Sequence, residues 1–191
     1  MSSIVFQGYN ESQIREGCMK GDRKFQQILY DMLSAKMFGL CLRYANEYNS
    51  AQDLLQEGFM KVFKNIDKFR DEGSFEGWVR RIFVNTAIEH YRKQVNLYAL
   101  HESEVNYYDH YQENALENLK HEDVLKMIQK LSSGYRTVFN LYVIEGYSHR
   151  EIAETMGISE GTSKSQLARA RYLLQKMIMG KAEISEQSSN G

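Results

Sequence analysis

Apolar residues in the N-terminal half of the chain recur at spacings of three and four, which is the pattern of amphipathic helices. The pattern is continuous from Asp22 to about Glu47 and predicts one long helix. Asn49 and Ser50 then offer a break and a cap. A second predicted helix follows and ends near Lys68.

A turn rich in Asp and Gly at residues 70–74 leads to a third predicted helix. Its residues on or near one face are Phe75, Trp78, Val79, Ile82, Phe83, Thr86, Ala87 and Tyr91. The C-terminal part predicts four shorter helices at 124–131, 135–145, 148–156 and 159–177. The short connections between them are typical of compact helical packing.

The last two predicted helices have the capping and turn residues of a helix-turn-helix. Ser148 and Glu151 form a capping-box pattern, Gly157 ends that helix, and Ser159 caps the next. Two sets of small or apolar residues are spaced to pack together: Ser163, Leu167, Ala170 and Leu174 in the second helix, and Ile152, Ala153, Met156 and Ile158 before it.

The opposite face of the second helix is polar and basic. Four cations lie in 159–177, where Glu160 is the only acid. The exposed candidates are Thr162, Lys164, Ser165, Gln166, Arg169 and Arg171. In a helix-turn-helix such a face reads base edges and binds phosphates in the major groove. Charge alone would favour a solvated bundle helix, but the order of caps, glycine turn and basic helix favours DNA binding.

Composition supports helices throughout. The 191 residues include no proline, and 42% are hydrophobic, so the chain can form a packed core and does not fit an all-β sandwich. We therefore expect an all-α protein. The length is compatible with one large domain or two small ones.

Charge divides the chain into four segments. Residues 1–93 carry +2, 94–118 carry −5, 119–180 carry +3 and 181–191 carry −1, which together give the net charge of −1. We expect two mildly basic domains joined by a flexible acidic linker, followed by a disordered tail. The near-neutral total hides two segments suited to nucleic acid.

Other chemistry is not indicated. The five histidines are scattered, and no phosphate-binding glycine loop, catalytic triad or metal-ligand spacing occurs, so we expect no cofactor, no metal and no enzyme activity. Cys18 and Cys41 are expected as reduced thiols on helices. No leader or apolar span is evident, and a cytoplasmic protein is expected.

The turn and helix around residue 75 combine aromatic and basic side chains, as single-stranded DNA binding requires. They are Phe69, Phe75, Trp78 and Phe83 with Arg70, Arg80, Arg81, Arg92 and Lys93. Helical spacing favours core positions over base contacts for Trp78, Ile82 and Phe83. Asn85 could contact a base edge or serve as a local cap, and its residue type does not decide between them.

Two blocks of sequence resemble the extracytoplasmic-function (ECF) sigma factors of bacterial RNA polymerase. Residues 53–63, 69–70, 73–75, 78–82 and 85–92 resemble sigma region 2, and residues 135–139, 145–153 and 157–171 resemble region 4. The blocks occur in the family's order, with the acidic linker where region 3 is missing. The resemblance implies two small helical domains, a region 2 bundle and a region 4 helix-turn-helix.

The resemblance also implies partners and sites. Core RNA polymerase would bind Asp53, Gln56, Glu57 and Phe59. The melted minus-ten element would meet Phe69, Ile82 and Asn85, with Arg80, Arg81 and Arg92 as nearby cations. The duplex minus-thirty-five element would meet Lys164, Ser165, Ala168 and Arg169, beside Thr162, Gln166 and Arg171. An anti-sigma factor is the regulator expected for this family.

Three positions depart from the family's pattern. Leu131-Ser-Ser-Gly134 replaces the common Leu-Pro, Ser163 replaces a frequent Val, and Gln166 replaces a frequent Arg, which affects the expected minus-thirty-five preference. Two other functions are compatible with the residues alone. One is a helix-turn-helix regulator that binds duplex operators without polymerase, and the other is a protein-interaction bundle.

Overall fold

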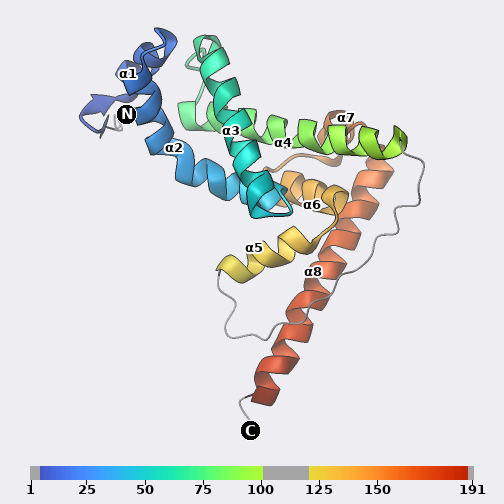
Figure 1. The fold of residues 1–191 in the computed structure, drawn as a ribbon. Coiled ribbons are helices and arrows are strands. Elements are labelled where there is room, and N and C mark those ends of the chain that lie inside the picture. Colours follow the sequence, from blue (N-terminus) through green and yellow to red (C-terminus); the bar gives the residue numbers. More distant parts are fainter. Residues whose placement is uncertain (1–4, 101–120, 189–191) are drawn as a thin grey trace. The chain divides into compact units, whose positions relative to one another are not determined.

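The computed structural model describes residues 5–100 and 121–188, and it is helical apart from one small hairpin (Figure 1). The hairpin pairs β1 (Val5–Phe6) with β2 (Tyr9–Asn10) in antiparallel register. The all-α prediction is confirmed, with these two short strands as an addition. The chain separates into two compact units, Met1–Ala87 and Ile88–Gly191.

The first unit is built from three complete helices, one 3-10 turn and the start of a fourth helix. These are α1 (Glu11–Met19), α2 (Arg23–Tyr44), α3 (Tyr48–Asn65), η1 (Ile66–Lys68) and α4 (Phe75–Leu100). The sequence reasoning missed α1. A capping box between Asn10 and Gln13 marks its start, and Ile14 and Cys18 provide its buried face, so both signals were present in the sequence.

The ends of α2 and α3 show where local signals decide and where packing does. The predicted start near Asp22 is confirmed, since Asp22 is the N-cap of α2 and its side chain accepts a hydrogen bond from the Lys24 backbone N–H at 2.8 Å. The third helix begins two residues before the predicted Ser50 cap, at Tyr48. The Tyr48 ring packs edge-on against Phe38 of α2, with ring centroids 5.2 Å apart, and this tertiary contact favours the earlier start.

A close approach between α3 and α4 forms the centre of the first unit. Phe83 is fully buried and lies against Gly58, where an added Cβ would be 2.3 Å from the Phe83 ring. The Phe59 ring meets Phe83 edge-on, with a centroid distance of 5.3 Å. Gly58 is therefore required for the spacing of the two helices.

The second unit contains α5 (His121–Lys130), α6 (Ser133–Phe139), the π-helix η2 (Asn140–Ile144), α7 (His149–Met156) and α8 (Glu160–Ser188). The single helix predicted at 135–145 is thus divided between α6 and η2. Asn140 lies at the junction and is buried, and its side-chain amide donates to the Arg136 carbonyl at 2.9 Å. The Asn140 side chain thus shares the Arg136 carbonyl with its own backbone N–H, at the point where the helix changes from α to π hydrogen bonding.

Arg136 joins α6 to the end of α5. Its buried guanidinium donates from Nη1 to the carbonyl oxygens of Gln129 and Leu131, at 2.7 and 3.1 Å. Burial lowers the pKa of Arg136 to about 10, well above neutral pH, so the guanidinium remains charged. This arginine binds carbonyls at the carboxyl end of a helix, which lack partners within the helix itself.

The predicted segment boundaries differ from the helix ends. The linker was expected at 94–118, but residues 94–100 belong to α4 and residues 101–118 lie outside the described residues. The last helix was expected to end near Met177, with a disordered tail from 181, whereas α8 continues to Ser188. No proline interrupts residues 178–188, and most of them have good helix propensity.

Candidate functional site

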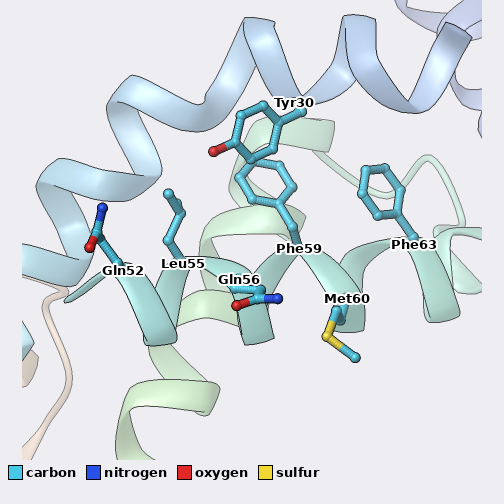
Figure 2. Close-up of a pocket in the computed structure, with 7 residues that line it drawn as sticks. All are labelled: Tyr30, Gln52, Leu55, Gln56, Phe59, Met60 and Phe63. Atoms are coloured by element: carbon cyan, nitrogen blue, oxygen red, sulfur yellow. The ribbon is translucent and has the colours of Figure 1, made fainter. Parts of the chain in front are cut away.

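A groove of about 430 Å³ lies along α3 in the first unit. Its lining residues are Tyr30, Gln52, Leu55, Gln56, Phe59, Met60 and Phe63 (Figure 2). The rings of Tyr30 and Phe59 lie 4.7 Å apart by their centroids, and the Phe63 ring is stacked beside Phe59. The surface is therefore apolar and aromatic, with glutamine amides at its edge.

The four residues predicted to bind polymerase divide into an exposed pair and a supporting pair. Asp53 and Gln56 are exposed on α3. Glu57 is half-buried, and its carboxylate pairs with the Lys61 ammonium at 2.9 Å. Phe59 is only 3% exposed, because its ring packs between Tyr30 and Phe83 as the floor of the groove. The sequence did not reveal Met60, which is 65% exposed at the same groove.

An aromatic cluster holds the loop between η1 and α4, which covers residues 69–74. Phe69 is half-buried, with its ring centroid 5.2 Å from Phe75 and 5.7 Å from Trp78. The guanidinium of Arg15, from α1, lies 4.8 Å from the Phe69 centroid. Phe69 is thus an anchored ring with partners on several sides.

The outer face of α4 carries the other residues predicted for the minus-ten element. Arg81 and Asn85 are exposed, Arg80 and Ile82 are half-buried, and Arg92 is exposed further along the helix. Phe83 is fully buried and belongs to the core, whereas Trp78 and Ile82 are half-buried. The structure therefore separates a polar face with Arg81 and Asn85 from the packed face of the same helix.

The predicted helix-turn-helix is confirmed in the second unit. Ser148 and Glu151 form a reciprocal capping box, and Gly157 ends α7 in the left-handed region with φ of 72°. Hydrogen bonds from the Ser148 backbone N–H and hydroxyl lower the pKa of the Glu151 carboxyl below its ordinary value. The Ser159 hydroxyl accepts from the Thr162 backbone N–H at 3.0 Å and so caps α8.

The seam between α7 and α8 is the predicted one. Ile152 and Ser163 are fully buried, and Leu167 and Met156 are only 4% exposed. Ser163 has a polar partner there, because its hydroxyl lies 2.9 Å from His149 Nδ1. The hydroxyl at this position is therefore accommodated by a hydrogen bond across the seam.

Most of the predicted DNA-binding residues of α8 share its outer surface. Those exposed are Lys164, Ser165, Ala168, Arg169 and Arg171. Arg169 lies over the Tyr172 ring, with its guanidinium carbon 5.2 Å from the centroid. Arg171 lies 5.7 Å from the Tyr142 centroid. Both cations are pre-oriented by aromatic neighbours and remain accessible.

Gln166 and Thr162 differ from that group, because both are half-buried. The Gln166 amide packs beside Gly134 of α6, where an added Cβ would lie 3.3 Å from Oε1. The Gln166 Oε1 atom is buried and accepts no hydrogen bond from the described residues. Gln166, one of the departures from the family pattern, thus faces the interior of the second unit.

The described residues contain no cluster of three or more side chains suited to a metal, and none of their helices is long and apolar enough to cross a membrane. Cys18 and Cys41 are free and buried, as expected. Burial raises the pKa of Cys18 to about 11 and that of Cys41 to about 12. Both thiols are therefore protonated and unreactive at neutral pH.

One residue that contacts the 69–74 loop was not predicted from the sequence. Arg15 reaches the 69–74 loop from α1, with its Nη2 atom 2.7 Å from the Asp71 carboxylate. The two residues are far apart along the chain, and neither belongs to a motif that would connect them. Only the packing of α1 beside η1 brings them together.

Comparisons with known proteins match both units. The family model for sigma-70 region 2 matches residues 29–96, and that for sigma-70 region 4 matches residues 121–174. The chain is 31% identical to an ECF RNA polymerase sigma-E factor of Haemophilus influenzae over 85% of this chain and 92% of the relative. It is also 31% identical to the ECF RNA polymerase sigma factor SigW of Bacillus subtilis, over 83% and 91%.

A solved structure has the same fold. It is the sigma factor RpoE in complex with the anti-sigma factor NepR from Bartonella quintana, with a TM-score of 0.50 and 24% identity. The alignment covers 82% of this chain and 98% of that sigma factor. The two sigma-70 regions match in order, and the alignments to both ECF relatives cover most of each chain. The chain therefore belongs to the ECF sigma factors of bacterial RNA polymerase.

Proposed function

We propose that this chain binds core RNA polymerase, brings it to promoter DNA and opens the minus-ten element so that transcription begins. The observation that carries the proposal is the presence of region 2 and region 4 in one chain and in that order. We assign residues 1–93 to the region 2 domain, 94–118 to the linker, 119–180 to the region 4 domain and 181–191 to the tail. Core polymerase catalyses the phosphoryl transfer, and this chain acts with it in the cytoplasm.

Polymerase binding is proposed for the α3 groove. Apolar surface with a polar edge is the usual composition of a protein interface, where buried aromatic and methionine side chains supply most of the affinity. Met60 and Tyr30 provide exposed apolar surface. Asp53 and Gln56 provide polar groups that can fix the orientation of polymerase on the groove. Phe59 supports this surface from below, since its ring is buried beneath Tyr30.

Promoter opening is proposed for the loop at 69–74 and the outer face of α4. Unpairing a duplex costs free energy, which stacking and hydrogen bonding to extruded bases offset. Asn85 offers both a donor and an acceptor, and Arg81 a positive charge for the phosphates. The anchored Phe69 ring forms the adjoining apolar wall.

Recognition of the minus-thirty-five element is proposed for α8. The Ser159 cap defines the start of this helix, and the exposed residues in its first turns are Lys164, Ser165 and Arg169. Arg171 provides a further cation toward the phosphates. An anti-sigma factor is the proposed regulator, as in the complex of the similar sigma factor RpoE with NepR.

Transcription from purified components tests the proposal. Core polymerase with this chain should start RNA at defined promoters, and core polymerase alone should not. Asp53→Ala with Gln56→Ala should weaken core binding, because both side chains are exposed beside the groove. Gln27→Ala with Asp31→Ala is the matched control, since this exposed pair on α2 does not line the groove.

Strand opening is tested separately. Asn85→Ala should reduce permanganate reactivity of the minus-ten thymines more than it reduces closed-complex formation. Absence of promoter-specific RNA across a broad set of promoter templates would refute the sigma function. Symmetric binding of a dimer to duplex operators without polymerase would instead support a helix-turn-helix regulator.

A further inference from the structure

Arg15 links α1 to the loop at residues 69–74 through two kinds of contact. Its Nη2 atom lies 2.7 Å from Asp71 Oδ1, and its guanidinium carbon lies 4.8 Å from the Phe69 centroid and 5.8 Å from that of Phe75. The Arg15 side chain is 16% exposed, whereas that of Asp71 is 68% exposed. A largely buried cation thus holds an otherwise exposed loop residue.

The backbone of this loop adopts a conformation that needs support. Asp71 has φ of 58° and Gly73 has φ of 101°. Asp71 and Gln7 are the two non-glycine residues with positive φ in the part of the chain that the structure describes. A left-handed conformation costs free energy at a non-glycine residue, though less at Asp and Asn than at other types, and surrounding contacts offset that cost.

The two ends of the loop are anchored by other groups. Phe69 is packed against Phe75 and Trp78 at the start. At the end, the Ser74 hydroxyl accepts from the Gly77 backbone N–H at 3.1 Å, at the first turn of α4. Arg15 is the contact from another helix that reaches the middle of the loop, through the residue with the strained φ.

We propose that Arg15 is a positioning residue for base recognition in the minus-ten element, acting by holding the 69–74 loop through Asp71 and Phe69. This inference rests on the proposed promoter-opening function of the loop and of α4. An ion pair whose carboxylate is exposed to solvent contributes little stability by itself. The contribution of this pair comes from restricting the loop to one conformation before DNA binds, which lowers the ordering cost of recognition.

A matched ion pair in the same unit separates this role from a general effect of charge. Lys36 Nζ lies 2.7 Å from Glu76 Oε2, the same length as the Arg15–Asp71 contact, and both side chains are exposed. It connects α2 to the first turn of α4 and does not reach the loop. Lys36→Ala therefore removes an ion pair of the same length next to the loop without releasing the loop.

The experiment uses the full chain assembled with core polymerase. It measures transcription from a promoter series altered one base at a time in the minus-ten element, together with core-binding affinity. Arg15→Ala should reduce discrimination between the best promoter and its altered versions by about tenfold, because the loop loses the charge-assisted contact that holds Asp71. Core binding should not change, since the α3 groove does not include Arg15.

Three further variants distinguish the positioning role from simple misfolding. Asp71→Asn keeps a residue that tolerates left-handed φ but removes the charge, and should reproduce the loss of discrimination. Arg15→Lys retains the charge but loses the planar stack on Phe69, and should give an intermediate result. Arg15→Ala combined with Asp71→Asn should be no worse than Arg15→Ala alone, because both disrupt one contact.

The possible outcomes are distinct. If Arg15→Ala and Asp71→Asn lower transcription from every promoter by the same factor, as a stability defect would, or behave like Lys36→Ala, the positioning role is wrong. If the wild-type chain directs no promoter-specific transcription, the proposed function itself fails and the promoter role of Arg15 fails with it. Loss of discrimination with normal core binding supports both the proposed sigma function and the positioning role of Arg15.

Discussion

The crossing of α3 and α4 at Gly58 provides a sharp test of how the polymerase groove is supported. Gly58→Ala would place a Cβ 2.3 Å from Phe83 Cε1 and 2.6 Å from Cδ1 and Cζ. Real Cβ contacts of this length do not occur, so the ring or the helix must move. Phe83 is fully buried, and Phe59 packs edge-on against it, so the displacement is transmitted to the floor of the groove.

The expected magnitude comes from two opposing effects. Overpacking a well-filled core destabilises by about 1–3 kcal/mol. Alanine is better than glycine inside a helix by about 1 kcal/mol. Because the contact is severe and Phe83 is fully buried, we expect the upper part of the overpacking range, about 2–3 kcal/mol, and therefore a net loss of about 1–2 kcal/mol in the free energy of unfolding.

The control is Gly39→Ala in α2, where an added Cβ meets nothing within 4 Å. This substitution should stabilise the first unit by up to about 1 kcal/mol, since only the propensity effect remains. Urea unfolding followed by fluorescence of Trp78, the single tryptophan, reports on the first unit alone. Core-polymerase affinity should fall for Gly58→Ala and remain unchanged for Gly39→Ala.

The result that would refute this reasoning is a Gly58→Ala variant at least as stable as the wild type, with unchanged core binding. Such a result would mean that α3 and α4 can separate at no cost. The close approach would then have no part in shaping the groove.

Three predictions concern the second unit. Arg136→Met should destabilise it by about 2–3 kcal/mol, measured by thermal unfolding, because two helix-end carbonyls lose a charged donor; an unchanged melting temperature would contradict this. Ser148→Ala should cost about 1 kcal/mol of stability and raise the pKa of Glu151 toward its ordinary value in an NMR titration. Because the folded pKa of Glu151 is lowered, this capping contact stabilises at neutral pH and is lost as the pH falls through that pKa. Arg169→Ala should weaken minus-thirty-five binding by about 1–3 kcal/mol and relax base preference. Gln166→Ala should instead change the free energy of unfolding more than base preference, because its side chain packs inward. Equal losses of base preference in the two variants would mean that both side chains contact DNA.

Features of the site that depend on nearby residues followed from the sequence. The Ser148–Glu151 capping box, the Gly157 turn and the Ser159 cap were predicted as the structure has them, because each joins residues no more than three or four positions apart. The buried seam of the helix-turn-helix followed from helical periodicity, for the same reason. Helix α1 was also encoded locally, by Asn10 and Gln13, although the pattern was overlooked.

Features that depend on which helix faces which were decided by the tertiary structure. Phe59 and Gln56 lie on one helix at neighbouring positions, but only the packing of Phe59 between Tyr30 and Phe83 makes it the floor of the groove and leaves Gln56 exposed. Gln166 fits an outer face by periodicity, yet the absence of a side chain at Gly134 lets it pack inward.

The contact between Arg15 and Asp71 is the clearest case. Neither residue type nor spacing connects a helix near the start of the chain to a loop beyond η1. Sequence patterns carry information about neighbours along one element, because the helical repeat relates their side chains directly. Contacts between elements depend on how several helices pack at once, and only the folded chain determines that arrangement.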